Sequence, residues 1–348
     1  MLLGTDTEGR NAWHLAAQGG NIETLQKLWE CAKENLTTEE IKNKLLLDTD
    51  NEGRTVWQLV AERGNIDILQ KLWDCAKENL KQEEIKNKLL LGTDNEGRTV
   101  WHFAAQRGRI ETLQKLWKCA KENITIEEIN KKLFLYTDME RRDFWNFSAW
   151  WGNGEVLQKL WECAKENLTT EEINNKLFLA TDNKGNTVWH FAAERGNTEI
   201  LQKLWEWAKE NLTTEEIKNK LLLATDNKKR TAWHLAGEWG NIEILQKLWE
   251  CAKENLTTEE KNKKLLLATD TEGRTALHLA AQRGNIYTLQ KLLECSKENL
   301  TTEEVKNKLL LATDNKKMTA WQLAAEWGNI ETLLKLWECA KEFLTTWR

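Results

Sequence analysis

Hydrophobic and polar positions along residues 181–224 follow the spacing of amphipathic helices in three successive stretches. The first stretch runs from Thr187, a residue type that caps helix starts, to Gly196, a residue type that ends helices in the left-handed conformation. The second has apolar residues at three- and four-residue spacing and reaches to about Asn211. The pattern therefore predicts a short helix followed by a longer one, each with one apolar face.

A third, short helix is predicted directly after the longer one. Thr213 and Glu216 have the spacing of a capping box, in which the threonine hydroxyl and the glutamate carboxylate each accept from the other residue's backbone amide. The helix is expected to continue through the leucines at 221–223 and to seal the seam with the next stretch of sequence.

This three-helix pattern recurs along the whole chain. A Thr-Asp pair marks each recurrence at a spacing of 44 residues, without insertion or deletion, so that eight repeats begin near residues 5, 49, 93, 137, 181, 225, 269 and 313. One repeat is too small to bury its own apolar face. The sequence therefore predicts a single all-α solenoid over residues 1–348, with about three helices per repeat, in which each repeat packs on its neighbours.

Tryptophan occupies one position in the first helix and one in the second helix of most repeats. In repeat seven both positions change together, to Leu277 and Leu293, which indicates that the two side chains touch within a repeat. Burying an indole removes about 150–250 Å² from water, so we expect both series to form the core. The first-helix series is Trp13, Trp57, Trp101, Trp145, Trp189, Trp233 and Trp321, and the second-helix series is Trp29, Trp73, Trp117, Trp161, Trp205, Trp249 and Trp337.

Charge and hydropathy argue against several classes of protein. The chain has 50 basic and 55 acidic residues, interleaved in every repeat, so it lacks the basic stripe of a nucleic-acid-binding protein. No apolar run reaches the roughly 18 residues of a membrane span, and the N-terminus lacks the layout of a signal peptide. We expect a cytoplasmic protein with neither a membrane nor a nucleic acid as its partner.

The seven cysteines share one position in the second helix. Stacked helices lie about 8–10 Å apart, whereas the Cα atoms of a disulfide lie within about 7 Å, so equivalent cysteines are expected to stay reduced. Trp207 holds the same position in repeat five, which indicates an apolar niche and not a ligand or redox site.

Residues 97–108, GRTVWHFAAQRG, and residues 273–284, GRTALHLAAQRG, resemble the first half of the ankyrin repeat, which runs Gly-x-Thr-Pro-Leu-His-x-Ala-Ala-x-x-Gly before an amphipathic second helix. The match recurs in all eight repeats. It departs from the family in its spacing, which is about 33 residues in ankyrin repeats, in its missing proline, and in tryptophan at the leucine position. The resemblance implies a helical solenoid whose concave groove binds partners.

Residue types with catalytic or ligating potential have structural explanations. The family's histidine position holds an amide in three repeats, and an amide can replace a hydrogen-bonding imidazole but not a general base or an ordinary zinc ligand. The resemblance implies that this histidine ties adjacent turns together. Glutamate pairs fall in the first turn of the third helix, where they complement the helix dipole. We therefore expect no enzymatic activity, cofactor or metal site. The residues at the histidine position are His14, Gln58, His102, Asn146, His190, His234, His278 and Gln322.

Much of the difference between repeats lies at the turn and at the two residues before the glycine that ends the first helix. The resemblance places these two residues in the concave groove, where partners dock. Interface hot spots favour tryptophan and arginine, and tryptophans two repeats apart would lie roughly 20 Å from each other, a spacing suited to an extended partner. The candidate binding residues are Glu62, Arg63, Gln106, Arg107, Trp150, Trp151, Glu194, Arg195, Glu238, Trp239, Gln282, Arg283, Glu326 and Trp327.

The alternation of these residues has two further explanations. Repeats four, six and eight also share a basic residue in place of the turn glycine, at Arg141, Lys229 and Lys317, so an ancestral two-repeat duplication accounts for the pattern equally well. A basic side chain near the turn can also lie over a neighbouring indole as a cation–π contact, which would make the tryptophans structural.

Repeat four departs furthest from the others, with RRDFWNFSAWWG at residues 141–152. Asp143 still has the capping position and Gly152 still ends the helix, so the fold signals survive while aromatic residues accumulate beside them. This pattern favours a partner hot spot centred on repeat four.

Two functions remain open from the sequence. The first is non-catalytic binding of a protein or peptide through the concave face. The alternative is a structural array that stacks head to tail, because the chain begins inside a third helix at Met1 and stops just after Leu344, where another should start, so neither end has a polar cap. A fragment of a longer array would have the same ends.

Overall fold

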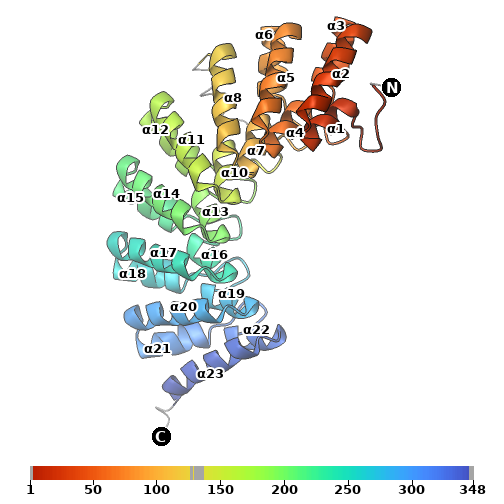
Figure 1. The fold of residues 1–348 in the computed structure, drawn as a ribbon. Coiled ribbons are helices and arrows are strands. Elements are labelled where there is room, and N and C mark those ends of the chain that lie inside the picture. Colours follow the sequence, from red (N-terminus) through yellow and green to blue (C-terminus); the bar gives the residue numbers. More distant parts are fainter. Residues whose placement is uncertain (1–2, 126–127, 129–136, 345–348) are drawn as a thin grey trace. The chain divides into compact units, whose positions relative to one another are not determined.

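The computed structural model describes the chain except for residues 1–2, 126–127, 129–136 and 345–348 (Figure 1). The part that is described consists of helices, turns and isolated bridges, which confirms the all-α fold class. The chain divides into two compact units, residues 1–169 and 170–348. The sequence-based expectation of one continuous array through both units stays a prediction.

In the first unit, each repeat contributes a short first helix and a longer second helix. The first helices pack side by side in chain order, and each also packs on the second helix of its own repeat. Third helices follow in repeats one and two, and the expected third helix of repeat three lies mostly outside the described residues. The first helices are α1 (Ala12–Gly19), α4 (Val56–Arg63), α7 (Val100–Gln106) and α10 (Phe144–Trp151), and the second helices are α2 (Ile22–Asn35), α5 (Ile66–Asn79), α8 (Ile110–Asn123) and α11 (Gly154–Asn167).

The second unit repeats this arrangement, with the first helices in one row and the second helices in another (Figure 1). The first helices are α13 (Val188–Arg195), α16 (Ala232–Trp239), α19 (Ala276–Arg283) and α22 (Ala320–Glu326), and the second helices are α14 (Thr198–Asn211), α17 (Ile242–Asn255), α20 (Ile286–Asn299) and α23 (Ile330–Leu344).

The third helices that the structure describes, in repeats one, two and four to seven, differ from expectation, because each begins as an α-helix and widens into a π-helix. In repeat five the capping box of Thr213 and Glu216 is present, and the chain then bonds at i to i+5, as from the Leu223 amide to the Lys218 carbonyl at 3.0 Å. The wider turn brings Leu221 and Leu222 to the same side as Ile217, and all three are buried. The α and π segments are α3 (Thr38–Ile41) with η1 (Lys42–Leu46), α6 (Gln82–Glu84) with η2 (Ile85–Leu90), α12 (Thr170–Ile173) with η3 (Asn174–Phe178), α15 (Thr214–Glu216) with η4 (Ile217–Leu222), α18 (Thr258–Glu260) with η5 (Lys261–Leu266), and α21 (Thr302–Glu304) with η6 (Val305–Leu310).

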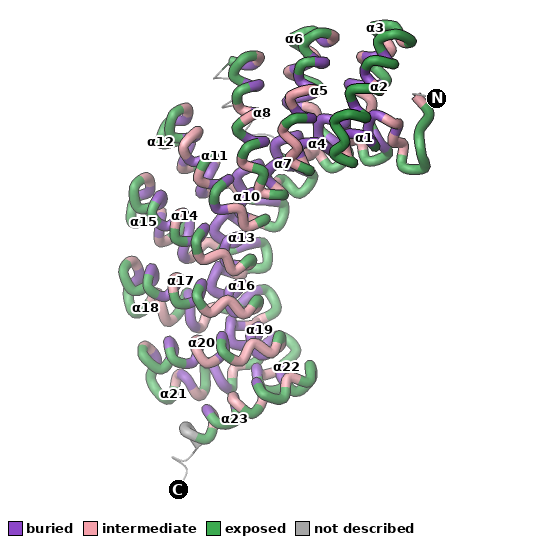
Figure 2. The backbone as a smooth tube through the Cα atoms, in the orientation of Figure 1, coloured by how far each residue is buried: buried purple, intermediate pink, exposed green. Residues whose placement is uncertain are grey.

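The predicted tryptophan pairs form the core of repeats one to six. Ring centroids of the two indoles in each pair lie 5.5–6.2 Å apart. The buried stretches of the chain run along the contact between first and second helices (Figure 2). The predicted contact is therefore confirmed in repeats one to six. Trp117 differs from the other indoles of these pairs in being only half-buried.

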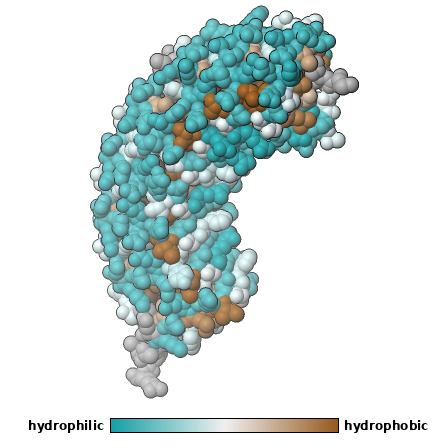
Figure 3. Space-filling view, viewed as in Figure 1, coloured by the Kyte–Doolittle hydropathy of each residue, from teal (hydrophilic) through white to brown (hydrophobic). Residues whose placement is uncertain are grey.

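The core prediction is wrong for repeat eight. Trp321 is 40% exposed and Trp337 is 45% exposed, because no described helix covers the side of α22 and α23 that the next repeat covers elsewhere in the unit. Leu334 and Ile330 are exposed as well. Figure 3 shows apolar residues gathered over α22 at this end of the second unit.

Candidate functional site

The residues predicted to bind a partner end the first helices, and the structure places them at the surface. From repeat two to repeat seven the first residue of each pair is half-buried and the second is exposed, whereas in repeat eight both are exposed. The glycine that follows has positive φ, as at Gly240 with φ 80°, so the chain reverses there and leaves the last turn of the helix facing outward.

Three of these residues are exposed indoles, in contrast to the tryptophans of the core. Trp151 is 40% exposed, Trp239 is 49% exposed and Trp327 is 60% exposed. Trp151 belongs to the first unit, and the other two belong to the second. An exposed indole offers a large apolar face that a partner can cover.

Trp150 belongs to a packed cluster in repeat four and is only half-buried. The guanidinium of Arg142 lies 4.8 Å from the centroid of the Trp150 ring and 5.3 Å from that of Phe147. Arg142 also pairs with Asp138 at 2.6 Å, and Trp150 meets Trp151 edge to face with centroids 4.9 Å apart. The cation–π interpretation therefore applies to Trp150, while Trp151 keeps the exposed face of the cluster.

The caps predicted for repeat four are present, but its amide does not replace the histidine. The Asp143 carboxylate accepts from the Asn146 amide at 2.7 Å, and burial raises the pKa of Asp143 to about 7. The side-chain amide of Asn146 is buried without a hydrogen-bond partner among the described residues. Gln58 does replace the histidine, because its longer side chain reaches the Gly92 and Arg98 carbonyls, each at 3.2 Å.

The Thr-Asp pair that recurs in every repeat has a structural role that was not predicted from the sequence. Its aspartate is buried at most repeats and organises the turn: the Asp226 carboxylate accepts from the Lys228 and Arg230 amides at 2.9 and 2.8 Å and from the Arg230 guanidinium at 2.8 Å. Arg230 reaches on to Glu238 at the end of α16, at 2.9 Å. Aspartate and arginine four residues apart at six of the eight turns could have indicated this ion pair.

Backbone hydrogen bonds join successive turns within the second unit. The Asn227 amide donates to the Lys184 carbonyl at 2.8 Å, and the Thr271 amide donates to the Lys228 carbonyl at 2.8 Å. The turns are thereby held in register beside the ends of the first helices. We call this surface of the second unit the turn-side surface. It consists of the turn residues 182–186, 226–230, 270–274 and 314–318 together with the pairs predicted to bind a partner, residues 194–195, 238–239, 282–283 and 326–327.

Part of the turn-side surface is hollowed. A hollow of about 410 Å³ lies across repeats six to eight. One wall carries Arg283, which pairs with Glu238 at 2.9 Å and lies 5.2 Å from the centroid of the Trp239 ring. The lining residues are Lys228, Arg230, Glu238, Glu272, Arg274, Gln282, Arg283, Trp327 and Asn329, so turn residues and predicted binding residues meet in one place.

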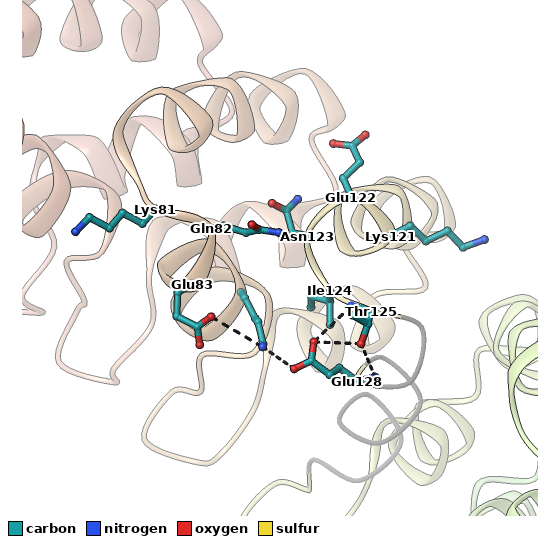
Figure 4. A pocket seen from close by; sticks show the side chains of 10 residues that line it. Lys81, Gln82, Glu83, Lys121, Glu122, Asn123, Ile124, Thr125 and Glu128 are labelled. Carbon is teal, nitrogen blue, oxygen red and sulfur yellow. Dashed lines mark hydrogen bonds and ion pairs between the residues drawn. The ribbon is translucent and has the colours of Figure 1, made fainter.

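Two hollows in the first unit have simpler explanations. The larger, of about 700 Å³, is lined by three basic and three acidic side chains, and Figure 4 shows Glu83 and Glu128 approaching one amine, that of Lys86, from two sides. These charges are balanced. The smaller, of about 170 Å³, is apolar and lies beside Trp101 and Trp117. Neither brings together residues of an acid–base or nucleophilic site.

His190, His234 and His278 have the structural role that the resemblance implied. The Nδ1 atom of His278 accepts from the Thr275 amide at 3.3 Å, and Nε2 donates at 3.0 Å to the carbonyl of Ala312, directly before the next turn. The Nε2 atoms of His14 and His102 are buried without a hydrogen-bond partner among the described residues. Burial lowers the pKa of all five histidines, to about 4 at His102.

The cysteines are reduced thiols and form no disulfide among the described residues, as predicted. Burial raises the pKa of Cys75, Cys119, Cys251 and Cys295 to about 12, which keeps them protonated and unreactive. Trp207 is buried in the equivalent position, in agreement with an apolar niche. Among the described residues, no three His, Cys, Asp or Glu side chains are grouped so that they could hold a metal ion.

Comparison with known proteins agrees with this architecture. A family model described as ankyrin repeats (3 copies) matches residues 147–260 and residues 248–345. No curated protein matches the chain. No helix among the described residues has the length and apolar character needed to cross a membrane. The two matches together span more than half of the sequence, and their repeats carry the helix pairs, the glycines after the first helices and the histidine hydrogen bonds described above. The chain therefore belongs to the ankyrin repeat family.

Proposed function

We propose that the chain is a non-catalytic scaffold that binds a protein or peptide through the ends of its first helices and the adjoining turns, the surface that corresponds to the concave groove of ankyrin repeats. Repeats of this family generally act as protein-interaction scaffolds. The proposal includes one continuous array in the cytoplasm, with no cofactor. Its candidate contact residues are the fourteen predicted from the sequence.

One observation carries the proposal. The chain buries most of its indoles in the core, yet Trp151, Trp239 and Trp327 stay 40–60% exposed at equivalent positions, each at the end of a first helix. Arginine stands at this position in repeats two, three, five and seven. Tryptophan and arginine are the residue types most enriched in interface hot spots, where burial by a partner contributes most to affinity.

Capture of partners from a cell lysate, read by mass spectrometry, tests the proposal. Replacing Trp151, Trp239 and Trp327 by alanine should leave the helix content unchanged and remove the main captured protein. The matched control is Tyr287→Ala, because Tyr287 is 69% exposed on the second helix α20, away from the turns. Equal capture by the wild type and the triple variant would contradict the proposal.

The apolar face of repeat eight supports head-to-tail self-association as a second candidate. Leu334 replaces a glutamine found at this position in the other seven repeats, and it lies exposed near Trp337 on α23. A further ankyrin repeat, from a second copy, would cover this face. Light scattering at increasing concentration tests the idea: growth that Leu334→Glu with Trp337→Glu abolishes would support it, and a constant monomer mass would contradict it.

A further inference from the structure

The turns of the second unit carry a net positive charge that those of the first unit lack. Residues 182–186, 226–230, 270–274 and 314–318 include seven basic and five acidic side chains, whereas residues 6–10, 50–54, 94–98 and 138–142 include five basic and eight acidic ones. The chain as a whole has a net charge of −5. The net positive charge is therefore a feature of these turns.

The excess charge lies at the exposed tips of the turns. Lys184, Lys228, Lys229, Lys316 and Lys317 are all exposed, while the aspartates at 182, 226, 270 and 314 are buried beneath them. Arg230 and Arg274 are occupied by their aspartates and by Glu238 and Glu272. The lysines are thus the charges that a ligand meets first.

Two of these lysines occupy a backbone conformation that disfavours them. Lys229 has φ 60° and Lys317 has φ 62°, where most other repeats have glycine. A side chain in this left-handed region is sterically disfavoured relative to glycine. The lysine side chain places an ammonium group at a solvent-exposed tip, where it can attract an anion.

Aromatic faces lie on the same surface as this charge. Trp327 lines the hollow together with Lys228 and Arg283, and Trp239 ends α16 beside it. Trp239 and Trp327 are two repeats apart, which corresponds to roughly 20 Å. An extended peptide spans this distance with about six residues. The geometry suits a chain that presents an apolar or aromatic side chain at each indole and carboxylates between them.

We infer that the turn-side surface of repeats six to eight binds an extended acidic peptide with aromatic side chains. This inference rests on the proposed function and specifies its ligand. A nucleic-acid strand fits less well, because a phosphate at every nucleotide would also meet Glu238 and Glu272 in the hollow. The peptide can place its carboxylates at the lysines alone.

Fluorescence anisotropy with synthetic peptides of about twelve residues tests the inference. In the probe, glutamates alternate with glycines and two tryptophans stand about six residues apart; a second peptide has glutamine for glutamate. The glutamate peptide should bind at least about tenfold more tightly at low salt, and added salt should weaken it, as expected for screened charges. Equal affinities, or no binding of the glutamate peptide, would overturn the inference.

The chain supplies its own substitution for the decisive variant. Lys228→Glu with Lys229→Gly, and Lys316→Glu with Lys317→Gly, give both turns the Asn-Glu-Gly tip of repeats two and three. This variant should fold and lose the preference for glutamate. The control variant makes the same change in net charge on the third helices, by Lys220→Glu, Lys264→Glu and Lys308→Glu. It should keep the preference for the glutamate peptide. Loss in both variants would overturn the inference.

Failure of the inference and failure of the proposed function are distinguishable. If the glutamine peptide binds as well as the glutamate peptide and Trp239→Ala with Trp327→Ala weakens both, the binding surface is correct and its acidic preference is wrong. Binding of both peptides without any effect of the alanine variants would contradict the proposed function. If an oligothymidylate binds more tightly than the glutamate peptide, the inferred ligand is wrong and the surface binds a nucleic-acid strand.

Discussion

At the scale of single residues, both ring nitrogens of His190, His234 and His278 are hydrogen-bonded, Nδ1 to the start of their own first helix and Nε2 to a carbonyl in or next to the following turn. The Nδ1 atom of His234 accepts from the Thr231 amide at 3.3 Å, so the ring proton lies on Nε2, which donates to the Ala268 carbonyl at 3.0 Å. Protonation of Nδ1 would break the first bond and place a charge in a buried site. Burial accordingly lowers the pKa of His234 in the folded protein.

This arrangement predicts a loss of stability in mild acid. The pKa of each histidine is lowered from 6.5 on folding, so the unfolded state binds protons first as the pH falls below about 6.5, and the free energy of unfolding decreases from there toward lower pH. Gln58 shows that glutamine can make the equivalent bonds. His234→Gln with His278→Gln should change the stability at pH 7.5 by less than about 1 kcal/mol and reduce its loss at pH 5. Urea unfolding at both pH values measures this, and an unchanged pH dependence would contradict it.

The turn lysines give a second prediction at this scale. Lys229→Gly should raise the free energy of unfolding by about 1 kcal/mol, because glycine adopts positive φ without steric cost. The reciprocal change, Gly273→Lys, should be destabilising by more than this, because a Cβ at Gly273 would lie 2.6 Å from the Asn315 Oδ1 atom. Thermal unfolding of both variants measures these changes in stability. A stabilising Gly273→Lys would show that the backbone relaxes there.

At the scale of elements, each first helix is held to its second helix mainly by a pair of large side chains. The contact repeats from Trp13 with Trp29 to Trp233 with Trp249, and the leucines of repeat seven fill the same space, with 1% and 2% exposure. Burial of the pair depends on a further layer of helices, as repeat eight shows. The helix pair and the stack therefore stabilise each other.

Equivalent tryptophans in two layers should differ in their contribution to stability. Trp205→Ala should lower the free energy of unfolding by about 3–5 kcal/mol, because it leaves a cavity at a residue that is 4% exposed. Trp337→Ala removes the same side chain from a position that is 45% exposed and should cost less than about 1.5 kcal/mol. Urea unfolding followed by far-UV circular dichroism gives both values, and equal losses would contradict the layer argument.

At the scale of the whole molecule, stability comes from contacts between adjacent repeats in each compact unit. The first helices α13, α16, α19 and α22 pack only in sequence, and hydrogen bonds between turns follow the same order. Such quasi-linear packing makes the stability of one repeat depend on how many neighbours cover it. Among the described repeats of the second unit, repeat eight leaves the largest apolar face uncovered.

Hydrogen exchange should therefore differ along the second unit. Amides of α22 and α23 should exchange faster than those of α16 and α17, because local opening of a repeat covered on one side exposes less new apolar surface. Mass spectrometry of peptides from the exchanged protein measures the gradient. Uniform protection across the four helices would show that the unit opens only as a whole.

The third helices show where a periodic pattern is informative and where it is not. The capping box and the apolar positions are local features, so Thr213, Glu216 and Ile217 indicated the start of the helix correctly. The change to π-helical bonding could not be predicted from these residues. Apolar residues four and five positions apart can lie on one face of an α-helix or of a π-helix, and only packing against the neighbouring second helix decides between the two.

The candidate site was predictable to a similar extent. Equivalence between repeats identified Trp151, Trp239 and Trp327 as surface residues, and the structure places them there. Trp150 is adjacent in sequence and belongs to a packed cluster, because Arg142 crosses the turn to lie on its ring. Arg230 was not singled out from the sequence, whereas in the structure its guanidinium connects a buried aspartate to Glu238 and forms part of the hollow.

The sequence by itself determined the succession of helices, their caps, the slots filled by indoles and the family, because each depends on contacts within a few residues and recurs eight times. Only the tertiary structure decided at which repeats the equivalent tryptophan position is buried by a neighbouring repeat. Trp205 and Trp337 have nearly the same local sequence, yet one is buried and the other is exposed. Burial and charge exposure are set by neighbouring repeats and not by the residue's own segment, and for that reason the exposed lysines of the turn-side surface emerged only from the packed structure.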